Sequence, residues 1–369
     1  MERLGNTKLT LKMTNNNCVI YRCPSNIALV KYWGKKEGGV QLPANPSISW
    51  TLSDLHATTK VTRTEIEANF SRDIQFDFYL AGERKSSFEP KIRQFLERIL
   101  PFMPQIKDFK WKIESTNNFP HGTGIASSAA GFGALALCFA EFQRMDFESK
   151  SENNPMRNEG EFLKIASKYA RLGSGSACRS VYGEPGIWGE TVSWEEANDE
   201  FAVPFNSEVH PSLKNWADVV LIVDDGEKSV SSTQGHDLLK EHPYAQSRYN
   251  QAQINLSRLL SLMQQGDVKG FISLVESEAL QLHSMMMSSE PYYLLIRPNT
   301  VALIEKIWRK RSENQWPMAF TLDAGANVHL LYDKSYTSEV MNFIEAELLP
   351  YCKNSLYLCS DIGSGPIKI

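Results

Sequence analysis

The stretch NNFPHGTGIASSAAGFGALAL, residues 117–137, decides the fold. Its glycines, among them Gly122, Gly124 and Gly131, let the backbone approach a ligand closely. Ser127 and Ser128 fall where the loop becomes a helix, predicted to run to about Phe142, and the first amides of a helix have no internal partner and attract anions. No Gly-Lys-Ser/Thr follows, so this is not a Walker A loop. Taken alone, the stretch favours a tightly packed Gly/Ala helix with a serine cap over a phosphate site.

Composition bounds the class of protein. The chain has 369 residues, with 42% hydrophobic and 22% charged, which indicates a globular protein of about two domains. Its net charge of −4 argues against a general nucleic-acid binder. The longest apolar run, residues 133–140, is shorter than the ~20 residues that span a bilayer. The polar N-terminus lacks signal-peptide features, and the six cysteines form no CxxC pair, so we expect a cytoplasmic protein.

Hydrophobic periodicity predicts strands mixed with helices, an α+β arrangement. In the first half we expect strands at 19–23 (ended by Pro24), 57–63, 74–80 and 110–114, and helices at 90–100, 127–142 and 161–172. In the second half we expect strands at 219–223, 318–322, 328–332 and 355–359, and helices at 245–263, 268–284, 299–312 and 336–348. The predicted organisation is a flexible leader at 1–18, an N-terminal domain at 19–208 and a C-terminal domain at 209–369.

The segment SNIALVKYWGKK, residues 25–36, concentrates cations around aromatic rings. Lys31, Lys35 and Lys36 flank Tyr32 and Trp33, and such donors could hold a diphosphate. An exposed basic turn that the aromatic rings anchor explains the segment equally well.

Two further segments carry short donors. GSGSACRSVYG, residues 173–183, offers Ser174, Ser176 and the planar fork of Arg179, which suits a carboxylate or phosphate. Alone, it reads better as a small-residue turn with a surface arginine. KSVSSTQGHD, residues 228–237, offers Ser232 and Thr233, which by default cap a helix.

Asp323 ends an apolar strand in FTLDAGANVHLLY, residues 320–332. An aspartate in this position is usually a turn former. In a phosphoryl-transfer site, it would instead orient or deprotonate the attacking hydroxyl.

Together these segments resemble a known family. Pro120, Gly124 and the run Ile-Ala-Ser-Ser-Ala at 125–129 are similar to the phosphate loop of GHMP small-molecule kinases. Asn-Ile-Ala-x-x-Lys-Tyr-Trp-Gly-Lys at 26–35 and Ser-Gly-Ser-Ala-Cys-Arg at 174–179 resemble diphosphomevalonate decarboxylases, as do 42–52 and 230–235. The likeness runs from about residue 19 to 332.

The resemblance implies a two-domain GHMP kinase fold: an N-terminal α/β domain with the phosphate loop and a C-terminal two-layer domain. Members of the family are commonly homodimers. They convert mevalonate 5-diphosphate and ATP to isopentenyl diphosphate, ADP, phosphate and CO2, with Mg2+ as cofactor.

The resemblance also assigns residues by motif. It gives catalytic roles to Asp323, Lys31 and Arg179. It places the substrate against Tyr32, Trp33, Gly34, Lys35, Ser174, Gly175, Ser176, Ala177, Cys178, Arg179, Ser232 and Thr233. It places ATP against Ser115, Gly122, Thr123, Gly124, Ile125, Ala126, Ser127 and Ser128, with Ser128 also near Mg2+, which is held mainly through the ATP phosphates.

The chain departs from the family pattern at three loops, with His121 after Pro120, Glu184 after Gly183, and Ala326 where the family has proline. The alternatives are a mevalonate 5-phosphate decarboxylase, a 3-kinase that stops after phosphorylation, and a non-catalytic metabolite-binding homologue. Since Asp323 and the other catalytic positions are kept, the last two are disfavoured. A monophosphate substrate stays open, because counting cations does not distinguish one phosphate from two.

Overall fold

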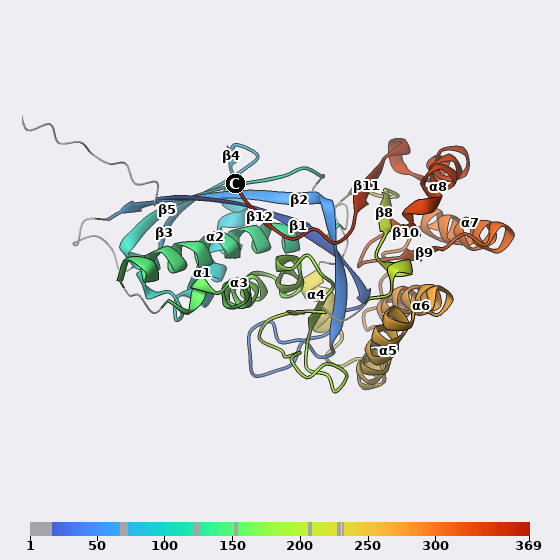
Figure 1. The fold of residues 1–369 in the computed structure, drawn as a ribbon, viewed down its shortest axis with the longest axis horizontal. Helices are drawn as coiled ribbons and strands as arrows, with labels where there is room; N and C mark the ends of the chain where they lie inside the picture. The colour runs from blue at the N-terminus through green and yellow to red at the C-terminus, as the bar shows by residue number, and fades with distance from the viewer. Residues whose placement is uncertain are drawn as a thin grey trace, which may run out of the picture.

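The computed structural model describes residues 17–66, 73–120, 125–150, 154–205, 209–226, 230 and 232–369. Most of the predicted leader lies outside these residues, as do His121 and the predicted ATP contacts Gly122, Thr123 and Gly124. The described chain forms two sheets, each covered by helices, and the strands β1 and β2 reach from the first toward the second (Figure 1). No helix among the described residues is long and apolar enough to cross a membrane.

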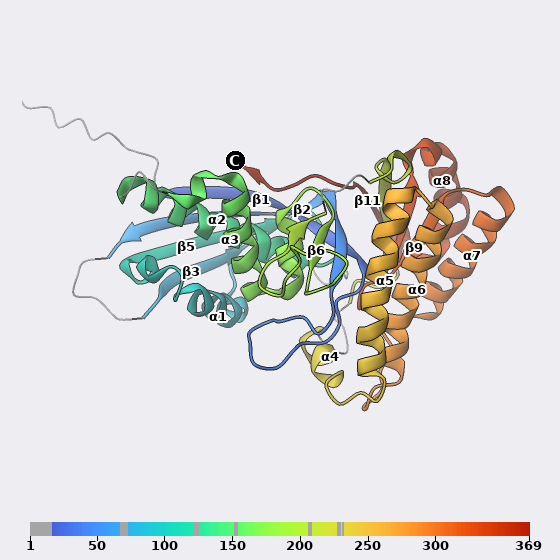
Figure 2. The same ribbon diagram turned by 60° about the horizontal axis from the view of Figure 1, so that its bottom comes forward.

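The first sheet has the strand order β12-β1-β2-β5-β3-β4, with β6 and β7 attached beside β2. Its bounds are β1 Cys18–Val30, β2 Ser47–Glu65, β3 Gln75–Leu80, β4 Glu83–Arg84, β5 Phe109–Asn117, β6 Gly186–Trp188 and β7 Val203–Pro204. Three helices cover one face of it (Figures 1 and 2): α1 Glu89–Ile99, α2 Ser127–Lys150 and α3 Glu159–Gly173. All the strands and helices predicted for this half are confirmed, with longer bounds for most of them.

The prediction that Pro24 ends the first strand is wrong. β1 continues to Val30, and its pairing with β2 shifts register between Pro24 and Ser25. A bulge tolerates a residue without an N–H, because the ladder is interrupted there anyway. The continuation matters for function, since it carries the chain from the first sheet to Lys31.

Helix α2 packs unusually close to the first sheet. A Cβ placed on Gly133 would lie 2.5 Å from Sγ of Cys23 on β1, so only glycine permits this approach. Ala134, Ala136 and Ala140 of α2 are buried in the same core. The tight Gly/Ala helix inferred from the sequence is therefore present, and its close packing fixes where its N-terminus points.

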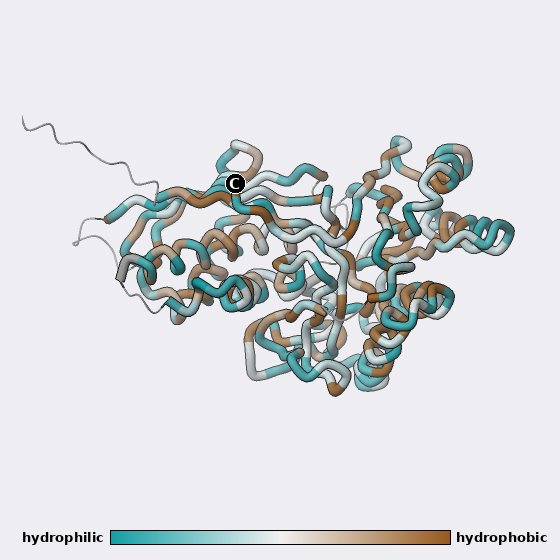
Figure 3. Tube along the Cα trace, viewed as in Figure 1, coloured by the Kyte–Doolittle hydropathy of each residue, from teal (hydrophilic) through white to brown (hydrophobic). Residues whose placement is uncertain are grey.

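The second sheet is antiparallel, with the order β11-β8-β10-β9. Its bounds are β8 Trp216–Leu221, β9 Met318–Thr321, β10 Val328–Asp333 and β11 Tyr357–Asp361. The helices are α4 Ser232–Leu238, α5 Ala245–Gln265, α6 Val268–Met287, α7 Pro298–Asn314 and α8 Thr337–Phe343, which continues as a π-turn over Ile344–Leu348. α5 and α6 run side by side (Figure 2), and brown and teal alternate along them in Figure 3, the pattern of helices with one buried face.

The C-terminal strand β12, Ile367–Lys368, returns to the first sheet and pairs with β1 at Tyr21 and Arg22 (Figure 1). A shared core of Trp50, Trp216 and Phe271 joins the two halves. The domain boundary at 208/209 stays a prediction.

Candidate active site

One cavity of about 380 Å³ brings five of the sequence motifs together. It is lined by most of the predicted site residues: Lys31, Tyr32, Trp33, Lys35, Ala126, Ser127, Ser128, Ser174, Gly175, Ser176, Arg179 and Asp323. A larger groove of about 980 Å³ lies between α6 and α7, but no predicted site residue lines it. The convergence of separate motifs, rather than size, marks the smaller cavity as the candidate active site.

Lys31 and Asp323 form an ion pair in this cavity. Lys31 directly follows β1 and Asp323 follows β9, so the pair joins the two halves of the chain. Lys31 Nζ lies 3.1 Å from Asp323 Oδ1, with side-chain exposures of 2% and 23%. Burial lowers the pKa of the Lys31 ammonium, and the charges of Asp323 and Glu278 oppose this shift. Asp323 is thus a carboxylate beside a buried cation, with part of its surface accessible to a ligand.

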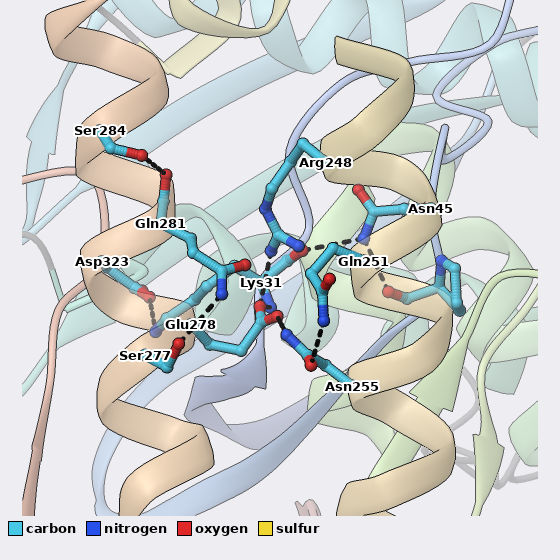
Figure 4. Close-up of polar contacts among 11 residues, drawn as sticks. Lys31, Asn45, Arg248, Gln251, Asn255, Ser277, Glu278, Gln281, Ser284 and Asp323 are labelled. Atoms are coloured by element: carbon cyan, nitrogen blue, oxygen red, sulfur yellow. Dashed lines mark hydrogen bonds and ion pairs between the residues drawn. The ribbon is translucent and has the colours of Figure 1, made fainter. Parts of the chain in front are cut away.

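The backbone of Lys31 is held on both sides by buried side chains (Figure 4). Its N–H donates to Glu278 Oε2 over 2.9 Å, and its carbonyl accepts from Asn45 Nδ2 over 2.9 Å. Glu278 is fully buried on α6 and also accepts from Arg248 Nη2 and Asn255 Nδ2 of α5, each over 2.5 Å. Both carboxylate oxygens are used, so the helices α5 and α6 fix the position of Lys31.

Sequence reasoning missed this network because its members lie far apart in the chain. The available signal was polar residues on the buried faces of two predicted helices.

Arg179 lies in the 3-10 turn Gly175–Val181, with 2% of its surface exposed, so the surface-arginine interpretation is wrong. The hydroxyls of Ser47 and Ser49 on β2 accept from its Nη1 over 2.5 Å and its Nε over 3.0 Å. Burial lowers its pKa. No carboxylate in the described part of the chain lies within ion-pair distance of it. Neutral hydroxyls therefore orient the cation without neutralising it, as an anion-binding site requires.

The interpretation of residues 25–36 as an exposed basic turn is also wrong, since Lys31, Tyr32 and Trp33 are largely buried. Gly34 has φ +100°, and a Cβ there would lie 2.3 Å from Tyr249 Oη, so glycine is required. Lys35 lines the cavity, and burial lowers its pKa. Lys36 instead pairs with Asp199 over 2.5 Å outside the cavity.

Not all members of the 174–178 segment face the cavity. Ser174, Gly175 and Ser176 line it, whereas Ala177 and Cys178 are fully buried beneath and are not lining residues. The Cys178 thiol donates to the Gly175 carbonyl over 3.0 Å, and burial raises its pKa to about 12. These two residues support the turn from behind.

The start of α2 opens into the cavity. Ala126, with φ +38°, Ser127 and Ser128 line it, and the Oγ atoms of Ser128 and Ser174 lie 3.3 Å apart. Ile125 is buried, and its carbonyl accepts from Ser25 Oγ over 2.7 Å. The free amides of this 24-residue helix suit a phosphate, with Ser128 beside it.

Three further predicted contacts are not placed in the cavity. Ser115 lies within β5, where its hydroxyl pairs with Thr59 Oγ1 over 2.9 Å, and it is not a lining residue. Ser232 and Thr233 begin α4, but their side chains lie outside the described part of the structure.

The cavity has further lining residues that sequence reasoning did not single out: Asn26, Ala28, Gln41, Lys91, Gln94, Phe132, Gly173, His236, Leu282 and Ala324. Asn26 donates to the Ser176 carbonyl over 3.1 Å and to Ser180 Oγ over 2.7 Å. Asn26 lies within the quoted 25–36 segment, so that motif indicated its place in the site. Nothing in the sequence indicated that Lys91 and Gln94 on α1 would line the cavity.

Family models match both halves of the chain. Residues 23–202 match the diphosphomevalonate decarboxylase-like N-terminal domain, and residues 218–364 match the mevalonate 5-diphosphate decarboxylase C-terminal domain. Among curated relatives, the diphosphomevalonate decarboxylase of Saccharomyces cerevisiae is 32% identical over 342 residues, which cover 87% of this chain and 79% of that protein.

Solved structures agree with this match. A crystal structure of mevalonate diphosphate decarboxylase from Staphylococcus aureus is 28% identical, with a TM-score of 0.80 over 96% of this chain and 98% of that one. A structure of MDDEF in complex with MVAPP, AMPPCP and magnesium is 26% identical, with a TM-score of 0.78 over 96% of this chain and 99% of its own. The chain therefore has the GHMP kinase fold and belongs to the diphosphomevalonate decarboxylase family.

Proposed function

We propose that this chain converts mevalonate 5-diphosphate and ATP to isopentenyl diphosphate, ADP, phosphate and CO2. The observation that carries the proposal is the Lys31–Asp323 pair, which shares one cavity with Arg179 and the start of α2. The arrangement supplies a carboxylate for a hydroxyl, an unpaired buried cation for a carboxylate, and helix amides for phosphates.

ATP binds, in this proposal, with its phosphates at the start of α2, against Ala126, Ser127 and Ser128. Mg2+ would be held mainly through these phosphates, with the Ser128 hydroxyl nearby, and would neutralise phosphate charge during transfer. The solved relative in complex with MVAPP, AMPPCP and magnesium supports ATP and Mg2+ as ligands in this proposal.

In the first step Asp323 accepts the proton of the tertiary C3 hydroxyl while that oxygen attacks the γ-phosphorus of ATP. The bond from the γ-phosphorus to the β,γ-bridging oxygen breaks, and ADP leaves with the electron pair. Lys31, 3.1 Å from Asp323, holds the carboxylate in position for this proton transfer.

In the second step the C3–O bond breaks and phosphate leaves with the electron pair. The electrons of the bond between C2 and the carboxyl carbon then form the C2–C3 double bond, and CO2 is released. Arg179 holds the substrate carboxylate in place for this step, and the buried walls exclude water from the electron-poor C3.

We further propose that the enzyme acts as a homodimer, as the resemblance implies. We also propose that it acts in the cytoplasm with no nucleic-acid or membrane partner, as the charge, the cysteines and the apolar runs of the sequence indicate. Sedimentation of the purified protein tests the dimer: a monomer at micromolar concentration would exclude it.

The activity is tested by adding Mg-ATP and, separately, mevalonate, its 5-phosphate and its 5-diphosphate to the purified chain. The proposal expects isopentenyl diphosphate, ADP and CO2 with the 5-diphosphate alone. Decarboxylation of the 5-phosphate, with ADP and CO2 released, would show that the monophosphate is the substrate and would leave the mechanism unchanged. ADP without CO2 would mean a kinase, and no turnover with any of the three would refute the proposed activity.

A further inference from the structure

His236 on α4 is an imidazole in the wall of the cavity that the proposed mechanism does not use. Its ring lies against both Tyr32 and Trp33, with centroid distances of 4.4 and 4.5 Å. Only 6% of its surface is exposed. Two aromatic contacts therefore hold the ring in one plane, and its rotation is restricted.

The tautomer of His236 follows from its backbone contact. The N–H of Gly34 donates to Nδ1 over 2.9 Å, so Nδ1 carries a lone pair and no proton. Burial, with a contribution from Lys35, lowers the pKa of His236 to about 3, so the ring is neutral at physiological pH. A neutral ring without a proton on Nδ1 must carry it on Nε2.

The resulting Nε2–H donor has no partner among the residues that the structure describes. Nε2 is not among the described side-chain atoms that are both buried and without a partner, so this donor is accessible from the cavity that His236 lines. A ligand bound in this cavity can therefore supply an acceptor to Nε2–H in place of water.

The surroundings of His236 indicate the charge of that ligand. Lys35 is near enough to lower the pKa of His236, and Lys35 and Lys91 both line the same cavity. The charge of Asp237, the next residue of α4, raises the pKa of Lys35, whereas the charges of Arg98 and Lys240 lower it. Cations thus outnumber the carboxylate around this wall, which favours a multiply charged anion.

We propose that Nε2–H of His236 donates a hydrogen bond to the diphosphate of the bound substrate. The contact rests on the function proposed above and adds a specificity-determining residue to it. A fixed neutral donor beside Lys35 selects the orientation of a phosphate oxygen, whereas a lysine provides a mobile point charge. The contact distinguishes the diphosphate end of the substrate from its carboxylate end, which Arg179 holds.

Two substitutions separate the donor from the rest of the ring. In His236→Asn the side-chain oxygen can replace Nδ1 as acceptor for Gly34, but the Nε2 donor is lost. In His236→Gln the amide nitrogen can reach the position of Nε2 and keep a donor. His242→Asn is the matched control, because His242 is also 6% exposed and bonds Ser288 Oγ through Nε2 outside the cavity.

The test measures KM for mevalonate 5-diphosphate and for ATP in each variant, with thermal melting as the check on folding. A hydrogen bond to a charged group predicts a KM for mevalonate 5-diphosphate raised about 10- to 100-fold in His236→Asn. The KM for ATP should change less than about 2-fold, His236→Gln should recover part of the loss, and His242→Asn should match the wild type.

An unchanged KM for the diphosphate in folded His236→Asn overturns the contact while the proposed function stands. Equal losses for ATP and substrate, without rescue by glutamine, assign His236 a structural role and also overturn it. If the wild-type chain turns over no mevalonate 5-diphosphate, the proposed function fails first.

Discussion

Substitution of Glu278 by glutamine tests whether the buried network controls the position of Lys31. The change keeps the size of the side chain but removes the charge that Arg248 contacts over 2.5 Å. It also replaces one of two accepting oxygens by an NH2 group, which cannot accept from Lys31, Arg248 or Asn255. At least one of these bonds must therefore break.

The magnitude follows from burial. Glu278 is 0% and Arg248 3% exposed at the side chain, and breaking a buried pair of this kind costs about 3–5 kcal/mol. An unfolding entropy of about 2.1 cal/mol/K per residue gives about 0.8 kcal/mol/K for a chain of 369 residues. The expected fall in melting temperature is about 4–6 °C.

The activity should fall as well, because the side chain that accepts from the Lys31 backbone N–H loses the charged contact with Arg248 that helps hold it in place. A displacement of about 1 Å at a catalytic group can cost about 10²-fold in rate, so we expect kcat to fall about 10- to 100-fold. Loss of the Glu278 charge also lowers the pKa of Lys31 further, which moves the alkaline limb of the kcat profile to lower pH.

Glu276→Gln is the matched control. Glu276 lies on the same helix, is buried, and accepts from Arg311, from Trp308 over 2.8 Å and from the backbone N–H of Phe320 over 3.2 Å. It lies outside the candidate active site. The melting temperature should fall by similar amounts in both variants, but only Glu278→Gln should change kcat and its pH profile. Equal kcat values in the two variants would refute the positioning role.

The remaining predictions concern three residues of the cavity. Asp323→Asn should bind mevalonate 5-diphosphate with near-normal affinity but lose at least about 10²-fold in kcat, measured by ADP release, because the proton acceptor is gone; near-normal turnover would remove its catalytic role. Arg179→Lys should lower kcat for CO2 release, since lysine cannot keep the fork that Ser47 and Ser49 orient, and an unimpaired variant would place Arg179 outside the site. The pKa of His236 is lowered to about 3 in the folded chain, so below pH 6.5 the unfolded chain binds more protons than the folded one. The free energy of unfolding therefore falls as the pH drops toward 3, and at pH 5 the loss is about 2 kcal/mol. Melting at pH 7 and pH 5 should therefore show a drop about 2–3 °C larger in wild type than in His236→Asn, and identical drops would contradict a neutral buried ring.

The local parts of the fold and site were predictable from sequence, because their signals are local. Each predicted helix and strand is present, since period and capping residues act within a few positions. The motif around Lys31 and the start of α2 at Ser127 were found for the same reason. The bulge at Pro24 was missed, because the proline alone does not show that the partner strand shifts register.

Long-range contacts were not predictable. Glu278 is 247 positions from Lys31, and nothing in either segment indicates the other. The same holds for Arg179, whose serine partners lie 130 and 132 positions away, so its burial appeared only in the structure. The assignment of Ser115 by resemblance stays a prediction, because Ser115 lies within β5 and is not a lining residue of the described cavity.

The central claim is that the C3 hydroxyl is phosphorylated before CO2 leaves, with Asp323 and Arg179 acting in one cavity. The most direct measurement uses mevalonate 5-diphosphate labelled with ¹⁸O in the C3 hydroxyl, incubated with the chain and Mg-ATP. Because the labelled oxygen attacks the γ-phosphorus and then leaves with it, the account predicts one ¹⁸O atom in each released phosphate. Unlabelled phosphate, with the label in water instead, would contradict it.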